Sequence, residues 1–302
     1  MDITVIGAAI IDILVGPVKN NIFAIGSCPV EYTKMSFGGD ALNEAIILSK
    51  LGKKVQLISK VGNDEAGERV IDFVKGNGLM TEYIAVEDGL TTGMNIVLIS
   101  EDGERSFLTN PKGSLRRLDK ENILPYVNEF ADIVSFASIF VSSMLTIENM
   151  EEVFKNIKNK DGRILTADMT KAKNGEKLED IKPLLKYIDY IFPNEEEIAL
   201  LTGIKDATRN AEILVEAGVK CAVIKCGRKG CIIKTKDEFY EIPAYLVEKP
   251  IDTTGAGDSF VAGFLSALSE GKSIEECGKF ACRVAAQVVQ SVGATSCSFD
   301  EM

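Results

Sequence analysis

The sequence places a carboxylate directly after a run of small residues. Residues 252–260 read Asp-Thr-Thr-Gly-Ala-Gly-Asp-Ser-Phe, and an apolar stretch with a helical pattern follows at 261–268. Because no bulky side chain stands in the way, the backbone N–H groups of Gly255, Ala256 and Gly257 can approach an anion at the start of a helix, where the helix dipole favours negative charge. These three residues are therefore predicted to form a phosphate-binding anion hole.

Asp258 stands beside this predicted anion hole. Its carboxylate can accept a proton from a hydroxyl group, while the neighbouring amides stabilise the charge that develops on a transferred phosphoryl group. On this interpretation Asp258 is the general base of a phosphoryl transfer. The residues alone leave a second interpretation open, in which Gly-Ala-Gly is only a tight turn and Asp258 is a favourable charge in the first helical turn.

Two absences limit the chemistry further. The chain contains no His, so acid-base work must fall to carboxylates, Lys, Tyr or Cys, and schemes with a histidine base or metal ligand are excluded. The Walker A pattern is absent, and residues 7–12 read Gly-Ala-Ala-Ile-Ile-Asp where a dinucleotide-binding G-x-G-x-x-G would follow the first strand. P-loop and Rossmann dinucleotide sites are therefore disfavoured.

Composition indicates a globular protein with small-molecule ligands. A hydrophobic content of 46% over 302 residues is enough for a large core, and a net charge of -11 disfavours nucleic acid and anionic membranes as partners. The longest weakly polar run, 133–145, is short of the ~20 residues that cross a bilayer. Seven Cys, an odd count without a Cys-x-x-Cys pair, suggest reduced thiols. With no signal-peptide pattern at the N-terminus, we expect a cytoplasmic protein.

Short β-branched runs alternate with stretches of helical period, which predicts βαβ units and a mostly parallel sheet with helices on both faces. Ligands of such sheets bind at the carboxyl ends of the strands. The expected strands are 3–7, 55–61, 131–138, 164–169, 190–192, 221–225, 231–234 and 239–242, and the expected helices are 41–51, 66–75, 147–158, 178–187, 195–201, 207–217, 257–268 and 274–290.

Two segments, 14–36 and 90–110, break this rhythm because they are rich in β-forming residues and lack a helical period. The second contains a hairpin pattern, with a turn at 101–104. We expect both to form a small β lid inserted into a single domain that spans residues 1–302. Ordinary surface hairpins without a ligand role are the alternative.

From end to end the sequence resembles the ribokinase family, also called the phosphofructokinase-B (PfkB) family of carbohydrate kinases. The resemblance rests on four motifs in the family's order and spacing: residues 37–45 continuing to Leu-Gly at 51–52, Asn-Glu-Glu-Glu at 194–197, Gly-Arg-Lys-Gly at 227–230, and the segment 252–260. It implies a ribokinase-like three-layer α/β/α core with a β lid. It also implies an ATP-dependent kinase that phosphorylates a hydroxyl of a small monosaccharide or sugar acid, with Asp258 as the base.

On the sugar side, the resemblance implies a site built from the end of the first βα unit, the Gly-Gly motif and the lid. A carboxylate and an amide suit vicinal hydroxyls because they supply complementary acceptors and donors. For Arg105 the alternative stays open that it is an exposed hairpin residue. The expected substrate-binding residues are Asp12, Gly38, Gly39, Asp40, Asn43, Asn95 and Arg105.

On the nucleotide side, the resemblance implies ATP and Mg²⁺, with Asn194 and Glu197 organising the metal and its waters near the phosphates. The alternative for this acidic cluster is an ordinary helix N-terminus. Gly227 and Gly230 are implied to shape a loop near the nucleotide. Lys225, which stands where many relatives carry Thr, places a positive charge near the phosphates.

The resemblance further implies a monovalent cation such as K⁺, bound by Asp252 and Thr254 together with carbonyl groups of residues 288–297. Unpaired strand edges and the family resemblance lead us to expect a homodimer formed through the lid. Two other functions stay open, a nucleoside kinase of the same fold and a sugar-binding sensor without catalysis. A sensor would have no need of a base such as Asp258.

Overall fold

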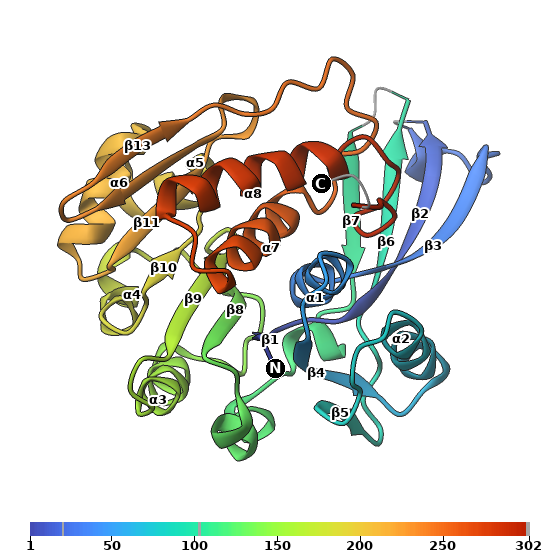
Figure 1. Cartoon of the computed structure of the whole chain (residues 1–302). Coiled ribbons are helices and arrows are strands. Elements are labelled where there is room, and N and C mark those ends of the chain that lie inside the picture. Colours follow the sequence, from blue (N-terminus) through green and yellow to red (C-terminus); the bar gives the residue numbers. More distant parts are fainter. Residues whose placement is uncertain (20, 102–103, 300–302) are drawn as a thin grey trace.

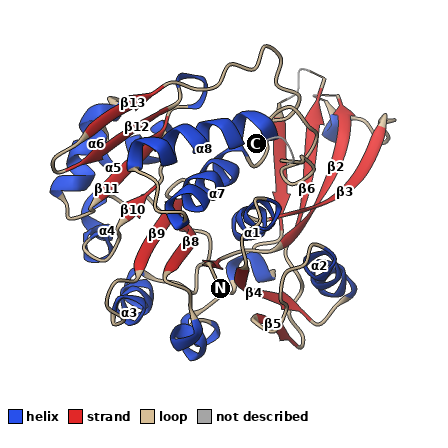
Figure 2. Ribbon diagram, viewed as in Figure 1, coloured by secondary structure: helices blue, strands red, loops and turns tan. Residues whose placement is uncertain are grey.

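The computed structural model describes residues 1–19, 21–101 and 104–299, and Figures 1 and 2 show a large sheet between helices with a smaller sheet beside it. The large sheet contains β1 (Ile3–Ile6), β4 (Val55–Gly62), β5 (Ile84–Glu87), β8 (Ile133–Ile139), β9 (Ile164–Met169), β10 (Tyr190–Ile191), β11 (Cys221–Lys225), β12 (Cys231–Thr235) and β13 (Phe239–Ile242). The helices are α1 (Asp40–Lys50), α2 (Glu65–Gly76), α3 (Ile147–Lys158), α4 (Leu178–Leu185), α5 (Glu195–Thr202), α6 (Ala207–Glu216), α7 (Ala256–Ser269) and α8 (Ile274–Val288). Among these described helices, none has the length and apolar character that a membrane span requires.

The large sheet is mostly parallel, as the alternation of strands and helices predicted. Within the described residues its strand order is β13-β12-β11-β10-β9-β8-β1-β4-β5, and neighbouring strands run parallel from β11 to β5. The two pairs at the other edge, β11–β12 and β12–β13, are antiparallel. Parallel strands bring their carboxyl ends to one edge of the sheet, so the loops that follow them gather there.

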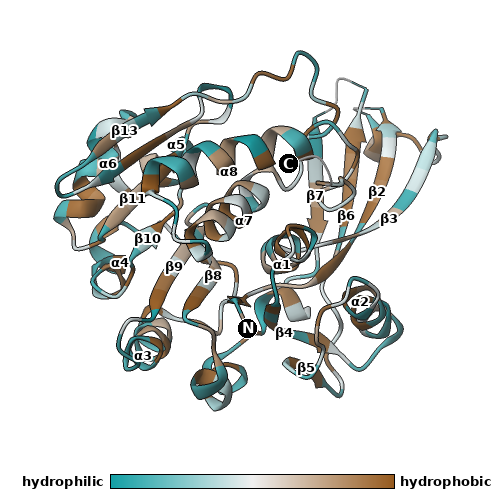
Figure 3. Ribbon diagram, viewed as in Figure 1, coloured by the Kyte–Doolittle hydropathy of each residue, from teal (hydrophilic) through white to brown (hydrophobic). Residues whose placement is uncertain are grey.

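Two hydrophobic cores fill the space between the sheet and its helices. In β11, Cys221 and Val223 belong to one core and Ala222 and Ile224 to the other, because successive side chains of a strand point to opposite faces. Helices α1, α2, α7 and α8 close the first core, and α3, α4, α5 and α6 close the second. Figure 3 shows strongly hydrophobic strands between these helices. The predicted three-layer α/β/α arrangement is confirmed.

A four-stranded second sheet contains β2 (Ile10–Val18), β3 (Tyr32–Gly38), β6 (Met94–Ser100) and β7 (Arg105–Thr109), in the order β3-β2-β6-β7. The β2–β6 pair is parallel and the other two pairs are antiparallel. Most of this sheet falls in segments 14–36 and 90–110, although β2 begins at Ile10. Residues 102 and 103 of the expected turn lie outside the described residues. We refer to these four strands as the lid.

Some elements differ from the sequence prediction. Strand β5 was not predicted, because it pairs at the sheet edge and buries only Ile84 of its four residues, which leaves almost no hydrophobic pattern. Three short 3₁₀ helices between the lid and β8 were also not predicted. They span Ser114–Arg116, Lys120–Asn122 and Leu124–Glu129, and are too short to show a helical period.

All seven cysteines are free thiols. Cys28, in the connection between β2 and β3, is partly exposed, whereas the other six are buried. Burial raises the pKa of Cys221 and of Cys277 to about 12, and that of Cys226 to about 11. Such thiols are structural side chains of the cores, because the reactive thiolate form is disfavoured.

Arg163 joins β8, β9 and α3 from inside the protein. Its guanidinium donates hydrogen bonds to the backbone carbonyls of Phe130 (2.9 Å), Ala131 (3.1 Å) and Ile157 (3.3 Å). The Ile157 carbonyl belongs to the last turn of α3, where carbonyl groups have no partner within the helix. One buried side chain therefore satisfies three carbonyls that no ladder bond reaches.

Replacing Arg163 with Met should lower the free energy of unfolding by about 3 kcal/mol or more, because each buried polar group left without a partner costs roughly 1–3 kcal/mol. Urea unfolding followed by circular dichroism measures the change. Arg69→Met is the matched control, since Arg69 is exposed and its ion pair among the described residues is with Glu65, one helical turn away. Equal midpoints for the two variants would contradict the role given to Arg163.

Candidate active site

The N-terminus of α7 forms the floor of the candidate site. Gly255 is its N-cap and adopts a left-handed conformation, with φ of 72°. A Cβ at Gly255 would lie 2.2 Å from Cβ of Ala294, so only glycine fits this turn. The amides of Gly255, Ala256 and Gly257 thus occupy the first turn of a 14-residue helix, where partial positive charge is concentrated.

Asp258 follows in the same helical turn and is held by α1. Asn43 Nδ2 donates a hydrogen bond of 2.7 Å to Asp258 Oδ2. Burial, and next the nearby Asp40 carboxylate, raise the pKa of Asp258 to about 7, although the Asn43 bond and Lys225 act in the opposite direction. A carboxylate with a pKa near neutrality is well suited to accept a proton. Asn43, expected to bind sugar, contacts the expected base.

The lid contributes a polar wall opposite α7. Asn95 on β6 lies beside Asp12 on β2, and its Nδ2 donates to Asp12 Oδ1 at 2.9 Å. Thr109 Oγ1 donates to Asn95 Oδ1, also at 2.9 Å. A Cβ at Gly38 would lie 2.3 Å from Asp12 Oδ2, so glycine makes room for this carboxylate. Burial raises the pKa of Asp12, opposed by the Asn95 hydrogen bond and the charge of Arg105.

The Gly-Gly-Asp motif joins the lid to α1. Gly39 has a φ of 98°, and a Cβ there would lie 2.5 Å from the carbonyl oxygen of Ala8. Asp40 Oδ1 accepts hydrogen bonds from the N–H groups of Ala8 (3.4 Å) and Ala41 (3.0 Å). Burial raises the pKa of Asp40, against these hydrogen bonds. In this structure Asp40 fixes backbone groups around the site.

Glu44 is a buried carboxylate that sequence reasoning missed. Its Oε2 accepts a hydrogen bond of 2.7 Å from Ser135 Oγ, and Oε1 has no partner in the described part of the chain. Burial, and further the charges of Asp168 and Asp258, raise the pKa of Glu44 well above its usual value. The available signal was an acidic residue within the otherwise apolar pattern of α1.

Lys225 brings a positive charge to the anion hole. Its Nζ lies 2.5 Å from Asp168 Oδ2 and 3.5 Å from the position that a Cβ of Gly257 would take. Burial alone would lower the pKa of Lys225, but Asp168 and Glu197 hold it above its usual value, so the ammonium stays charged. Asp168 was not predicted, because only the fold brings the ends of β9 and β11 together.

A pocket of about 350 Å³ adjoins the anion hole and Lys225. Gly227 and Gly230 lie on its wall, together with residues of α7 and α8 and of the 244–250 connection. Gly230 has a φ of 101°, and a Cβ there would lie 1.9 Å from the Ile242 carbonyl oxygen. The loop predicted to lie near a nucleotide therefore borders a pocket next to the predicted phosphate site.

Asn194 and Glu197 form a reciprocal cap at the start of α5. Asn194 Oδ1 accepts a hydrogen bond from the Glu197 N–H, and Glu197 Oε2 accepts one from the Asn194 N–H, both at 2.8 Å. The backbone of Asn194 also pairs with that of Lys225. Burial raises the pKa of Glu197, opposed by the charge of Lys225. Both residues thus lie near Lys225. The reciprocal cap does not use Oε1 of Glu197 or Nδ2 of Asn194.

The Asp252 carboxylate forms an ion pair with Arg105 of the lid. Arg105 Nη2 lies 2.5 Å from Asp252 Oδ1, which also accepts hydrogen bonds from Thr254 N (2.8 Å) and Thr254 Oγ1 (2.7 Å). Asp252 Oδ2 accepts one from the Gly293 N–H at 3.0 Å. Burial alone would raise the pKa of Asp252, but the bonds from Thr254 and Gly293 and the charge of Arg105 hold it below its usual value.

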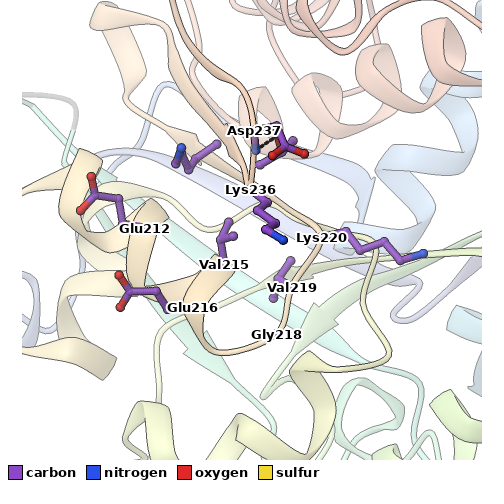
Figure 4. A pocket seen from close by; sticks show the side chains of 10 residues that line it. Glu212, Val215, Glu216, Gly218, Val219, Lys220, Lys236 and Asp237 are labelled. Carbon is purple, nitrogen blue, oxygen red and sulfur yellow. Dashed lines mark hydrogen bonds between the residues drawn. The ribbon is translucent and has the colours of Figure 1, made fainter.

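A second depression, of about 750 Å³, lies away from these residues between α6 and the β12–β13 turn (Figure 4). Glu212, Glu216 and Lys236 line it, and none of the predicted site residues does. Its Lys220 pairs with Asp189 at 2.5 Å. Figure 1 shows α1 and α7 next to the lid, away from α6.

Known proteins of one family are similar to this chain in sequence and in fold. The family described as pfkB family carbohydrate kinase matches residues 1–301. An uncharacterized sugar kinase of Archaeoglobus fulgidus is 30% identical over 251 residues, 82% of this chain and 96% of its own. A ribokinase of Haemophilus influenzae is 29% identical over 277 residues, 87% of this chain and 84% of its own.

A solved structure of Arabidopsis thaliana ribokinase, complexed with ribose and ATP, has the same fold. It superposes with a TM-score of 0.82 at 25% identity, and the match covers 98% of this chain and 95% of that one. Together with the family match over nearly the whole length, this places the chain by sequence and by fold. The protein belongs to the PfkB family of carbohydrate kinases and is an ATP-dependent kinase.

Proposed function

We propose that this kinase transfers the γ-phosphoryl group of ATP to a hydroxyl of a small monosaccharide or sugar acid, with Asp258 as the general base. The observation that carries the proposal is the position of Asp258. It is held by Asn43 in the same helical turn as the anion hole, between the polar wall of the lid and the pocket beside Gly227 and Gly230. An acceptor bound against the lid and ATP bound in the pocket would meet at this carboxylate.

The reaction follows from this arrangement. The sugar hydroxyl gives its proton to Asp258 as its oxygen bonds to the γ-phosphorus, and the bond from that phosphorus to the bridging oxygen of ADP breaks. The amides of Gly255, Ala256 and Gly257 face the charge that develops on the transferred group, and Lys225 adds a positive charge beside them. Because little covalent chemistry falls to the protein, most of the rate comes from positioning and electrostatics.

Asp12 and Asn95 are the proposed contacts for sugar hydroxyls. A carboxylate next to an amide offers both acceptors and donors, which suits neighbouring hydroxyl groups. Gly38 makes room for the Asp12 carboxylate and Gly39 for the backbone of Ala8, so both glycines shape the wall against which the sugar would bind. Asn43 acts differently in this proposal, because its amide is already directed at Asp258 and so orients the base.

Kinases of this family use ATP, and Mg²⁺ is generally required. When bound, Mg²⁺ neutralises charge on the phosphates. Asn194 and Glu197 fit a hard cation held through water. Burial raises the pKa of Glu197 because it disfavours the ionised carboxylate, and a nearby cation would stabilise that ionised form. The described residues contain no cluster of three or more His, Cys, Asp or Glu side chains arranged to hold a metal directly. The K⁺ site expected at Asp252 and Thr254 is not part of this proposal, because Arg105 already holds that carboxylate.

A nucleoside kinase is the second candidate, on the strength of Phe107. Pairing opposite Val97 puts Phe107 on the same face of the lid as Asn95 and Asp12, and its side chain is exposed. An aromatic ring there would suit a nucleobase. A thermal-shift screen of free sugars, sugar acids and nucleosides with a non-hydrolysable ATP analogue separates the candidates, since the true acceptor raises the melting temperature most.

Replacing Asp258 with Asn should lower kcat by about 10² to 10⁴, because the variant keeps the size of the side chain but cannot take the proton. ADP release in a coupled assay measures the rate with the best acceptor from the screen. Calorimetry should show that both ligands still bind within roughly tenfold. The control is Asp12→Ala, which should lose sugar binding first. More than about a tenth of the wild-type kcat in the Asn variant would show that Asp258 is not the base.

The activity should also depend on pH through Asp258. Its pKa is raised to about 7, so at lower pH the carboxylate is protonated and cannot act as a base. We expect kcat/KM to rise with pH and to level off above about pH 7. Asn43→Ala removes the hydrogen bond that lowers this pKa, so its profile should be displaced to higher pH. Profiles that coincide for the two proteins would argue against Asn43 as the residue that tunes the base.

A homodimer through the lid is the proposed assembly. Three side chains on the face of the lid opposite to Asp12 are 40–47% exposed, namely Met35 on β3, Ile96 on β6 and Leu108 on β7. Nearer the core the same face is covered by α2, where Phe37 stacks on Phe73. The uncovered part is an apolar surface that a second copy of the lid could bury by two-fold symmetry.

Light scattering at micromolar concentration should give twice the 32.8 kDa of one chain for the wild type. Ile96→Glu should give the single-chain mass, because a charge in the middle of the apolar face has no partner there. Phe239→Glu is the control, since Phe239 is equally exposed but lies on β13 at the far edge of the large sheet. A dimer that survives Ile96→Glu would rule out this face.

A further inference from the structure

Arg105 connects the lid to the loop that opens the anion hole. It stands at the start of β7, and Asp252 lies 147 positions later, three residues before Gly255. The guanidinium is 26% exposed and the carboxylate only 6%, so the contact of 2.5 Å between Nη2 and Oδ1 lies mostly away from solvent. A charge-assisted hydrogen bond in such a place is strong.

One oxygen of the Asp252 carboxylate is fully used. Oδ1 accepts hydrogen bonds from Arg105 Nη2 and from the N–H and Oγ1 of Thr254, which is more than its two lone-pair positions. Oδ2 accepts one hydrogen bond, from the N–H of Gly293. The hydroxyl of Thr254 is likewise turned toward Asp252 as a donor.

The segment 288–297, expected to supply carbonyl ligands to a monovalent cation, is also held by protein groups. It meets Asp252 through an N–H group, that of Gly293. The Nζ of Lys50, in the last turn of α1, donates to the carbonyl oxygens of Thr295 (2.6 Å) and Cys297 (2.9 Å). A second fixed positive charge therefore stands at the far end of the segment.

These residues do not fit a bound K⁺ ion. An ion on Oδ1 would compete with three donors, and an ion on Oδ2 would share that oxygen with the Gly293 N–H. At either oxygen it would lie within a few ångströms of the Arg105 guanidinium, where like charges repel in a mostly desolvated site. The negative charge that such an ion would neutralise is already neutralised. The family resemblance predicted a monovalent cation at this place, where the structure has the guanidinium of Arg105 from the lid.

We propose that Arg105 is the fixed cation of the anion hole, so that the guanidinium and not a monovalent ion holds the loop from Asp252 to Gly255 in its phosphate-binding conformation. The inference rests on the proposed function in one respect, that this loop binds the phosphates of ATP. Arg105 is then a positioning residue, because it acts on the phosphates through Asp252. The kinase should therefore work equally well in K⁺, Na⁺ and a large organic cation.

Nucleotide affinity tests this without requiring turnover. Calorimetry with a non-hydrolysable ATP analogue and Mg²⁺ is carried out in potassium, sodium and tetramethylammonium chloride at equal ionic strength. The wild-type Kd should agree within about twofold in the three salts, because no monovalent ion takes part. Arg105→Met should bind roughly tenfold more weakly in tetramethylammonium, and K⁺ should restore part of the affinity by occupying the vacated carboxylate.

Two further variants separate charge from shape. Arg105→Lys keeps the positive charge and should stay close to wild type in every salt. Lys34→Met removes a charge from an exposed position on β3 of the same lid and should change neither affinity nor salt dependence. Near-ultraviolet circular dichroism of each variant checks that the fold is retained.

Several outcomes would overturn the inference. One is a wild-type protein whose affinity rises severalfold in K⁺ over tetramethylammonium, since an ion site would then exist. Another is an Arg105→Met variant that binds the analogue with wild-type affinity in all salts. A third is an Arg105→Lys variant whose affinity falls as much as that of Arg105→Met, since the positive charge would then be irrelevant. Failure of the proposed function looks different, because the analogue would not bind in any salt, or it would bind while no sugar is phosphorylated.

Discussion

The hydrogen bond from Asn43 to Asp258 joins the two halves of the site. It links the first turns of α1 and α7, which lie 215 positions apart in the chain. The helices meet at a residue without a side chain, because the N-cap of α7 is Gly255, where a Cβ would lie 3.7 Å from Asn43 Nδ2. The lid, the anion hole and the base are all placed relative to this junction.

Carboxylic acids are concentrated around that junction. Burial raises the pKa of Asp40, Glu44, Asp168 and Asp258. The charges of Asp40 and Asp168 raise the pKa of Asp258 further, and all three of these Asp residues raise that of Glu44. Lys225 is the cation that faces them from β11. A site with this charge balance favours ligands that arrive with cations, as ATP does with Mg²⁺, and disfavours free phosphate groups.

Much of the fold could be predicted because its signals are local. The strands of the large sheet are continuous β-branched runs, and α8 begins at Ser273 with the Ser-x-x-Glu pattern of a capping box. Strand β5 and the 3₁₀ helices escaped prediction because they carry too few buried residues to show a period. The lid's β2 begins at Ile10, before the expected start at residue 14, and its first residues Ile10 and Ile11 are buried.

The site residues also differ in how far they could be predicted, according to whether they are close together in the sequence. The predicted anion hole and Asp258 lie within four consecutive residues, so the sequence could suggest their chemistry, although the residues alone left a simple tight turn as the alternative. Glu44 and Asp168 became visible only when the fold brought α1 and the end of β9 together. Arg105 was expected to meet the substrate, but its partner stands 147 positions away on another element, and no pattern along the chain connects them. Contacts between distant segments determine such roles.

The distribution of thiols gives the lid a property of its own. Six cysteines are buried in the core, whereas Cys28 lies partly exposed in the connection between β2 and β3. A thiol reagent therefore meets one accessible sulfur, and that sulfur lies between two strands of the lid. The native chain thus carries a built-in attachment point for a single fluorescent or spin label on the lid.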